Sequence, residues 1–353
     1  MAALLALTFA QSPFDAGRWT IADPNAKVMP YLGETSLFLD NGIAVLTESS
    51  FADGTIDVDV ALHGHASFAG LLFRGISRDD YELVYLRAHR SRQWDALQYT
   101  PIFAGSEAWQ LYSGKGYTAA TELPANRWVH LRLAVKGYTA RLYVDRAADP
   151  QLVVTDLKRP WARGQVGVWG RLGGANFANL VISSDTSATA PAAVPSAPLA
   201  SAISTWELSP VWDEAQVSPS RLPDARANAG WMKVTAERDG LVNIARYRQP
   251  IVRRQASPAA NNRDLVFARA TITSPAARRA RLVFAYSDAV HIFVNGTLLF
   301  EGEGRFRSRD PGFLGIASLG PDAIYVDLVA GRNELVFAVS ETFGGWGLAA
   351  RVE

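Results

Sequence analysis

The chain has 353 residues, 35 basic and 34 acidic side chains, a formal net charge of +1, and no cysteine. This charge balance gives no electrostatic reason to expect nucleic acid or an anionic membrane as a partner. The missing cysteines exclude a disulfide framework and thiolate chemistry, and the length predicts about two domains that depend on packing alone.

The first residues predict either an export signal or a first strand. Residues 1–10 read MAALLALTFA, an apolar run that is too short to span a bilayer. The run resembles the core of a secretory signal, although no basic segment precedes it. We therefore predict that residues 1–12 are a signal-peptide remnant, that the protein is secreted or periplasmic, and that it has no membrane span.

Residues 13–182 predict a domain of many short strands. Apolar and polar residues alternate over 55–62 and 128–135, and 141–145 and 165–169 continue the pattern. Period-two alternation places one face of each strand in a core. Glycine-containing turn pairs separate these strands, and no amphipathic helix of three turns interrupts them. The pattern predicts an antiparallel β-sandwich or jelly roll.

A change in composition divides the chain after this domain. Residues 183–203 are almost entirely Ser, Ala, Pro and Thr, which predicts a semi-extended linker. In residues 204–353 Asn295-Gly296 lies between two apolar runs and predicts a hairpin turn, because both turn positions need φ > 0. Further strands are expected at 265–272, 280–286, 290–294, 324–328 and 333–340. The sequence therefore predicts an all-β protein of two antiparallel sandwich domains.

The first domain carries aromatic and planar polar residues that suit a sugar. Aromatic rings cover the C–H faces of sugars, and planar polar groups contact neighbouring hydroxyls. The candidate binding residues are Arg74, Tyr85, Arg87, His89, Gln98, Tyr99 and Trp109. Tyr85, Arg87 and His89 have the same parity and are expected on one strand face. The structural alternative is an outer face of mixed polarity with cross-strand pairs.

Glu82 and Glu107 are the first candidates for catalytic carboxylates. Arg74 and Glu82 flank a turn at 77–80, so they could form a cross-strand ion pair. That pair would either be structural or hold Glu82 as an acid or base.

Asp57 and Asp59 also share a strand face, and paired carboxylates perform glycoside hydrolysis. Their structural alternative is pairing with Arg132 or Arg141 on a solvated sheet face.

In the second domain the candidate ligand contacts are Asp288, Asn295, Arg309 and Trp346. Asp288 and Asn295 also fit as turn residues, and Trp346 also fits as a core residue between glycines. No metal site and no cofactor are predicted, although loop carboxylates could hold a structural calcium ion.

Several segments of the first domain carry a family resemblance. They read FADGTIDVD at 51–59, SFAGLLFR at 67–74, YELVYLR at 81–87 and GQVGVW at 164–169. With them, residues 50–182 resemble the concanavalin A-like lectin/glucanase jelly rolls, and more narrowly the 3-keto-disaccharide hydrolase-like domains. The resemblance implies two packed sheets, of which the concave one can receive a sugar. The strand at 57–62 lacks the Glu-x-Asp-x-x-Glu pattern of laminarinase-type members, which speaks against that mechanism.

The second domain resembles the galactose-binding-like jelly rolls over residues 265–353. The segments that carry this resemblance are IFVNG at 292–296, GRNEL at 331–335 and FGGWG at 343–347. Ligand binding is common in that superfamily.

The sequence as a whole predicts a secreted carbohydrate-binding protein. Its partner would be a glycan or oligosaccharide held on the concave sheet of the first domain, with a role as an accessory to polysaccharide degradation. One alternative is a glycoside hydrolase or 3-keto-glycoside-cleaving enzyme that uses the same concave site. The other is a non-catalytic protein-interaction module.

Overall fold

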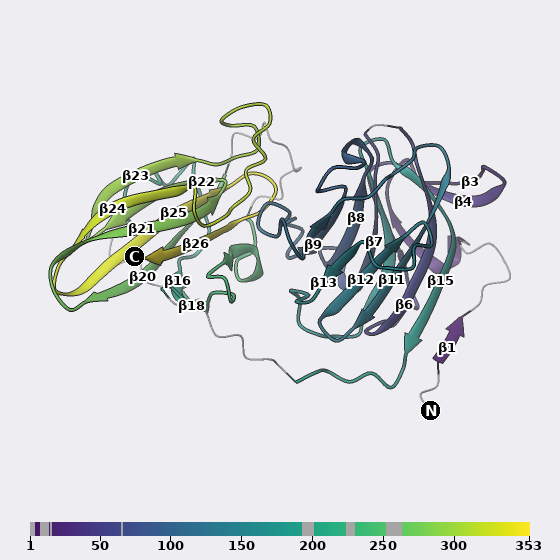
Figure 1. Ribbon diagram of the computed structural model, residues 1–353, viewed down its shortest axis with the longest axis horizontal. Coiled ribbons are helices and arrows are strands. Elements are labelled where there is room, and N and C mark those ends of the chain that lie inside the picture. The colour runs from purple at the N-terminus through teal and green to yellow at the C-terminus, as the bar shows by residue number, and fades with distance from the viewer. Residues whose placement is uncertain are drawn as a thin grey trace. The chain divides into compact units, whose positions relative to one another are not determined.

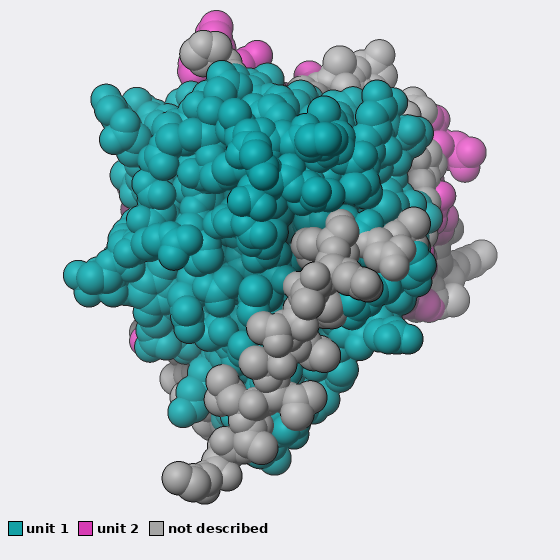
Figure 2. All heavy atoms as spheres, turned by 90° about the vertical axis from the view of Figure 1, so that its right-hand side faces the viewer, with its two compact units in different colours: residues 1–105, 112–193 teal, residues 106–111, 194–353 magenta. Residues whose placement is uncertain are grey.

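The computed structural model describes residues 4–7, 14, 16–64, 66–192, 201–223, 230–251 and 263–353. The chain divides into two compact units (Figure 1). Unit 1 comprises residues 1–105 and 112–193, and unit 2 comprises residues 106–111 and 194–353 (Figure 2). Within the described ranges the helices are short 3-10 turns: η1 (Ala16–Arg18), η2 (Ala88–Arg90) and η4 (Ile244–Arg246). The all-β prediction is therefore confirmed.

Unit 1 is built from two antiparallel sheets (Figure 1). The β6 sheet contains, in spatial order, β13 (Leu152–Val154), β12 (Thr139–Val144), β11 (Trp128–Lys136), β6 (Gly54–Leu62), β15 (Ala175–Asp185), β4 (Glu34–Leu39) and β3 (Lys27–Tyr31), with β1 (Leu4–Leu7) paired to β15. The β8 sheet contains β10 (Thr118–Ala119), β9 (Leu97–Ile102), β8 (Asp80–Arg87), β7 (Phe68–Ser77), β14 (Gln165–Arg171), β5 (Gly42–Leu46) and β2 (Trp19–Ala22).

Alternation along the strands explains how these sheets pack. Ile56 and Val58 of β6 are fully buried, and the antiparallel register places Leu133 and Leu131 of β11 opposite them. These side chains meet those of the β8 sheet in one core. Burying each such aliphatic side chain contributes about 1.5–3 kcal/mol, so a sandwich of this size needs no cross-links.

Unit 2 is a second arrangement of two antiparallel sheets. The β25 sheet contains β18 (Met232–Thr235), β16 (Thr205–Leu208), β20 (Asp264–Ser274), β25 (Gly331–Glu341), β22 (Ala289–Val294) and β23 (Thr297–Glu303), with β17 (Trp212–Asp213) paired to β20. The β21 sheet contains β19 (Val242–Asn243), β26 (Gly347–Val352), β21 (Arg278–Ser287) and β24 (Asp322–Leu328). Their facing side chains form the core of this unit. Asn295 and Gly296 have φ of 50° and 82° and join β22 to β23, which confirms the predicted hairpin.

The two segments expected to lie outside the domains fall partly beyond the described residues. Of residues 1–12, only 4–7 are described, and Leu4 pairs with Asp185 at the end of β15. The predicted linker, 183–203, begins inside β15, which continues to Asp185. Residues 193–200 of that linker lie outside the described residues.

Unit 2 includes a short segment, 106–111, that the sequence pattern did not assign to it. The Trp109 ring lies edge-on to Phe306 and Phe343, with 5.9 Å between centroids in each case. The backbone N–H of Gln110 donates to the Gly344 carbonyl at 3.0 Å, and its side-chain Nε2 donates to the Leu314 carbonyl at 2.9 Å. These contacts build the segment into the interior of unit 2.

The glycines around Trp346 are explained by this segment. A Cβ at Gly344 would lie 2.3 Å from Gln110 Oε1, and a Cβ at Gly345 would lie 2.8 Å from Leu111 Cγ. Both glycines also have positive φ, which side chains disfavour. The Gly-Gly-Trp-Gly sequence thus provides bare backbone on which residues 110 and 111 pack.

Candidate functional site

The β8 sheet is apolar on both of its faces. Its inner face joins the core of unit 1, and its outer face carries a second group of buried apolar side chains. We call one end of this outer face the aromatic–arginine cluster. Its members are Phe68, Tyr85, Arg87, His89, Gln98 and Trp169.

Strand register brings the cluster together. Tyr85 of β8 lies opposite Gln98 in β9 and opposite Gly70 in β7. Trp169 of β14 lies opposite Gly70 from the other side, so the glycine separates the two rings. A Cβ at Gly70 would lie 2.9 Å from Tyr85 Cβ and 2.8 Å from the Val84 carbonyl oxygen. The missing side chain lets the Tyr85 and Trp169 rings approach to 5.3 Å.

Hydrogen bonds fix the planar polar groups of the cluster. Arg87 Nη2 donates to the Tyr85 hydroxyl at 2.8 Å and to Gln98 Oε1 at 2.9 Å. Its Nη1 donates to Asp95 Oδ2 at 2.9 Å, and the other Asp95 oxygen accepts from Arg90 Nε at 2.7 Å. A guanidinium with a buried carboxylate on one edge has one preferred orientation, so the ring of Tyr85 beneath it is held as well.

The members of the cluster differ in exposure, and we call the buried ones its base and the accessible ones, Phe68 and His89, its edge. Tyr85, Arg87 and Trp169 are 5%, 7% and 8% exposed, whereas Phe68 is half-buried and His89 is exposed. The Phe68 and His89 rings lie 5.1 Å apart. Partial burial and the neighbouring guanidinium groups lower the pKa of His89, which keeps its imidazole neutral at pH 7. The edge therefore offers an aromatic ring beside a neutral group that can both donate and accept hydrogen bonds.

Two predicted residues, Tyr99 and Glu82, lie on the inner face instead. The Tyr99 hydroxyl donates to Glu82 Oε2 at 2.7 Å and accepts from the Lys158 backbone N–H at 2.8 Å. Glu82 Oε1 accepts from the backbone N–H of Arg159 at 3.0 Å. Both side chains are fully buried, and burial raises the pKa of the Glu82 carboxyl. This arrangement anchors the 158–159 segment to the sandwich.

Arg74 lies outside the cluster, and its ion pair is formed with Asp53, while Glu82 attracts its charge without a direct contact. The β7–β8 register shifts between Phe73 and Ser77, and Arg74 at this irregularity has φ of 51°. Its side chain consequently lies in the interior, where Nη2 contacts Asp53 Oδ1 at 2.8 Å.

The remaining acidic and aromatic candidates of the N-terminal half also lie outside the cluster. Glu107 and Trp109 belong to the 106–111 segment of unit 2. On the outer face of the β6 sheet, His130 contacts Asp59 at 2.8 Å and Asp57 at 3.2 Å. Arg132 lies 3.5 Å from Asp57, in agreement with the structural alternative proposed for the two aspartates.

In unit 2, three of the predicted ligand contacts support the fold. Asp288 is fully buried and accepts from the backbone N–H groups of Thr342 and Phe343 at 2.8 and 2.9 Å. Asn295 Oδ1 accepts from the Glu334 N–H across the hairpin. Trp346 is fully buried, and its indole donates to the Val339 carbonyl. Arg309, the fourth, lines a pocket.

The described ranges contain neither a metal-binding group of side chains nor a membrane-spanning helix. No group of three or more His, Cys, Asp or Glu side chains there is placed to hold a metal ion. No helix in those ranges is long and apolar enough to cross a membrane.

Comparison with known proteins gives structural matches only. No family model matches the chain, and no curated protein sequence matches it. Among solved structures, 153 chains match. They include carbohydrate-binding module CBM66 from Bacillus subtilis (17% identity, TM-score 0.36, covering 46% of this chain and 93% of that one).

Two further matches have similar statistics. The VIP36 exoplasmic/lumenal domain, in its Ca²⁺/Man3GlcNAc-bound form, has 13% identity and a TM-score of 0.38, and the match covers 51% of this chain and 89% of that one. The β-glucanase of Bacillus licheniformis has 12% identity and a TM-score of 0.36, covering 51% and 97%.

Proposed function

We propose that unit 1 binds a carbohydrate at the Phe68–His89 edge of the aromatic–arginine cluster. The observation that carries the proposal is the pair of accessible rings, 5.1 Å apart, on a base that Arg87 holds through Tyr85, Gln98 and Asp95. An aromatic ring covers the apolar C–H face of a sugar, and a neutral imidazole can bind its hydroxyls. Rigid support lowers the ordering cost that a flexible site would meet on binding.

Binding without turnover fits the positions of the carboxylates. Glu82 is fully buried on the inner face, with both oxygens accepting hydrogen bonds. Beside the cluster lies the carboxylate of Asp95, which is 1% exposed and holds Arg87 and Arg90. Most glycoside hydrolases use two carboxylates that flank the glycosidic bond. The cluster is therefore suited to binding a sugar, and we propose that the protein is a carbohydrate-binding protein.

The test is a glycan array probed with the intact protein, followed by titration of each hit against variants. Phe68→Ala and His89→Ala should each weaken binding about tenfold, which corresponds to about 1.4 kcal/mol. Arg132→Ala, on the outer face of the β6 sheet, is the matched control and should leave affinity unchanged. Equal affinity of all variants would refute the site, and an array without hits would refute the function. Product formation from a bound glycan would place the protein among enzymes instead.

We also propose that the protein is exported, because residues 1–10 form an apolar run of signal-like composition. Mass analysis of the protein made in its own cells would test this. A product that keeps residues 1–12 and stays in the cytoplasm would contradict export.

A further inference from the structure

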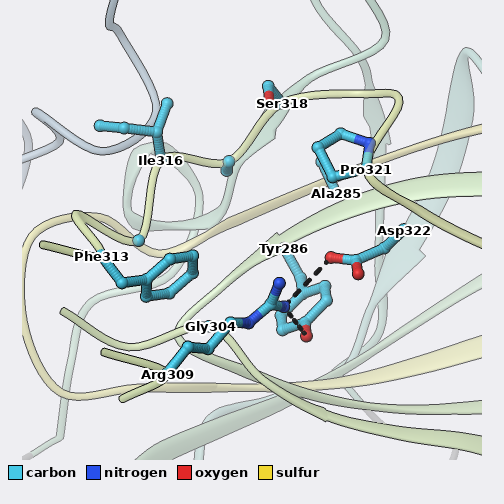
Figure 3. Close-up of a pocket in the computed structure, with 11 residues that line it drawn as sticks. Ala285, Tyr286, Gly304, Arg309, Phe313, Ile316, Ser318, Pro321 and Asp322 are labelled. Atoms are coloured by element: carbon cyan, nitrogen blue, oxygen red, sulfur yellow. Dashed lines mark hydrogen bonds and ion pairs between the residues drawn. The ribbon is translucent and has the colours of Figure 1, made fainter. Parts of the chain in front are cut away.

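Unit 2 contains a pocket of its own, between the loop that follows β23 and the strands β21 and β24 (Figure 3). It encloses a cavity of about 50 Å³. Its lining includes the charged side chains of Arg309 and Asp322 and the aromatic rings of Tyr286 and Phe313. Strand β21 supplies Tyr286, the start of β24 supplies Asp322, and the loop supplies the other two.

Arg309 is the centre of this pocket. One terminal nitrogen, Nη2, donates to the Tyr286 hydroxyl at 3.1 Å and contacts Asp322 Oδ2 at 3.3 Å (Figure 3). Nε donates to the Glu303 carbonyl at 3.3 Å, and the guanidinium carbon lies 4.7 Å from the centroid of the Phe313 ring. The guanidinium is therefore held on several sides before any ligand arrives.

The phenol of Tyr286 is also held in place. A Cβ at Gly302 would lie 2.3 Å from its hydroxyl oxygen, and a Cβ at Gly304 would lie 3.0 Å from Cε2. The bare backbone at these two positions lets the ring lie against the end of β23. Burial, together with the Asp322 charge, raises the pKa of Tyr286, so the hydroxyl keeps its proton at pH 7.

Hydrogen-bonding capacity is left over in the pocket. Within the part of the chain that the structure describes, Arg309 Nη1 and Asp322 Oδ1 have no hydrogen-bond partner. The Tyr286 hydroxyl accepts from Arg309, and its own proton has no acceptor there. Arg309 and Asp322 are 41% and 27% exposed, so a solute can reach them. The pocket thus offers donors and an acceptor side by side, next to an aromatic ring.

This combination selects for a neutral polyhydroxylated ligand. A carboxylate or phosphate would be repelled by the negative charge of Asp322, and a cation would be repelled by the positive charge of Arg309. Two adjacent hydroxyls can instead accept from Arg309 and donate to Asp322, while neighbouring C–H groups pack on Phe313. The cavity volume suits the edge of a sugar ring that stays partly in solvent.

We propose that this pocket is a second carbohydrate site, which binds an uncharged sugar through two neighbouring hydroxyls. It does not depend on the site proposed for unit 1, because each site is built from residues of its own unit. The protein would then bind glycans at two places.

The experiment is saturation-transfer NMR on the full chain with the methyl glycosides of glucose, galactose and mannose, and with glucuronate as the anionic probe. At least one neutral glycoside should bind to wild type and to Phe68→Ala. Asp322→Asn, which is nearly isosteric, and Arg309→Met should weaken that binding at least tenfold. Arg307→Met is the matched control, because Arg307 lies on the same loop but does not line the pocket. Its affinity should be unchanged.

Several results would overturn the proposal. One is the absence of binding by all three neutral glycosides, and another is binding of glucuronate alone. A third is an Asp322→Asn protein with the wild-type melting temperature and undiminished affinity. If Phe68→Ala removes all binding, the sugar belongs to unit 1 and the pocket is not a site. If Phe68→Ala keeps the binding and Asp322→Asn removes it, the pocket stands whatever the array shows for unit 1.

Discussion

Removing the Asp288 carboxylate should destabilise unit 2 far more than removing an exposed aspartate. Oδ2 of Asp288 accepts from the backbone N–H groups of Thr342 and Phe343 at 2.8 and 2.9 Å, and from the Thr342 hydroxyl. The Asp288 backbone N–H donates to the Ser340 carbonyl, and its carbonyl accepts from Gly304. The residue therefore fixes the connection between β25 and β26 to the start of β22.

The expected magnitude follows from the donors that would be left without an acceptor. In Asp288→Ala the two backbone N–H groups lose their partner in a buried place, at about 1–3 kcal/mol each, so the free energy of unfolding should fall by about 2–6 kcal/mol. Asp288→Asn keeps an amide oxygen that can accept from both groups. We expect a loss of about 1–2 kcal/mol for that variant, because a neutral acceptor forms weaker hydrogen bonds than a charged one.

Hydrogen-exchange mass spectrometry suits this test because it reports unit 2 separately, whereas a single fluorescence transition would average both units. Peptides that cover 335–350 should exchange faster in Asp288→Ala, and urea unfolding followed through the same peptides gives the free energy. Asp327→Ala is the matched control, since Asp327 is 77% exposed and pairs with Arg279 on the surface. Equal stability of the Asp288→Ala and Asp327→Ala proteins would refute the reasoning, as would an Asn variant as unstable as the Ala variant.

Two further substitutions test a close backbone contact in unit 2 and a buried carboxyl group in unit 1. Gly344→Ala should lower the free energy of unfolding of unit 2 by about 1–3 kcal/mol, because its Cβ would lie 2.3 Å from Gln110 Oε1 and its φ is 97°. Gly17→Ala, which has open space at Cβ, is the control in the same denaturation assay, and equal losses would contradict the expectation. In unit 1, burial raises the pKa of Glu82 above its unfolded value of 4.5, so its protonated form stabilises the fold below pH 4.5 and that stability is lost as pH rises through the folded pKa. Because glutamine cannot titrate, the unfolding free energy of wild type minus that of Glu82→Gln should fall with rising pH above 4.5, and a constant difference would count against the buried site.

Strand positions could be predicted from the sequence because alternation survives in a half-buried sheet. Residues 55–62 and 128–135 form β6 and β11 nearly as expected, since one face of each strand is polar. The same rule fails in β8, where residues 81–87 are all buried and both faces are apolar. Trp169 lies on the outer face beside Tyr85, where it is 8% exposed.

Contacts that depend on an irregularity or on distant segments could not be predicted. Arg74 pairs with Asp53 because β7 changes register after Phe73, and nothing in the local sequence announces that shift. The 106–111 segment belongs to unit 2 although its neighbours in the chain belong to unit 1. By contrast, Tyr85 and Arg87 could be placed on one face from strand parity, whereas the position of Gln98 opposite Tyr85 depends on the register between β8 and β9.

The surroundings of Glu82, Asp288, His89 and Arg309 show which of these candidates serve the fold and which reach the surface. Glu82 and Asp288 are fully buried, and each accepts hydrogen bonds from backbone N–H groups of another segment. A carboxylate in that position must stay in place for the fold, and it cannot reach a substrate in solvent. His89 and Arg309 are accessible, and each lies beside an aromatic ring, which is a geometry for contact with hydroxyls and C–H groups. The buried carboxylates thus stabilise the two sandwiches, and His89 and Arg309 are the accessible groups to which the two proposed sites assign contact with a ligand.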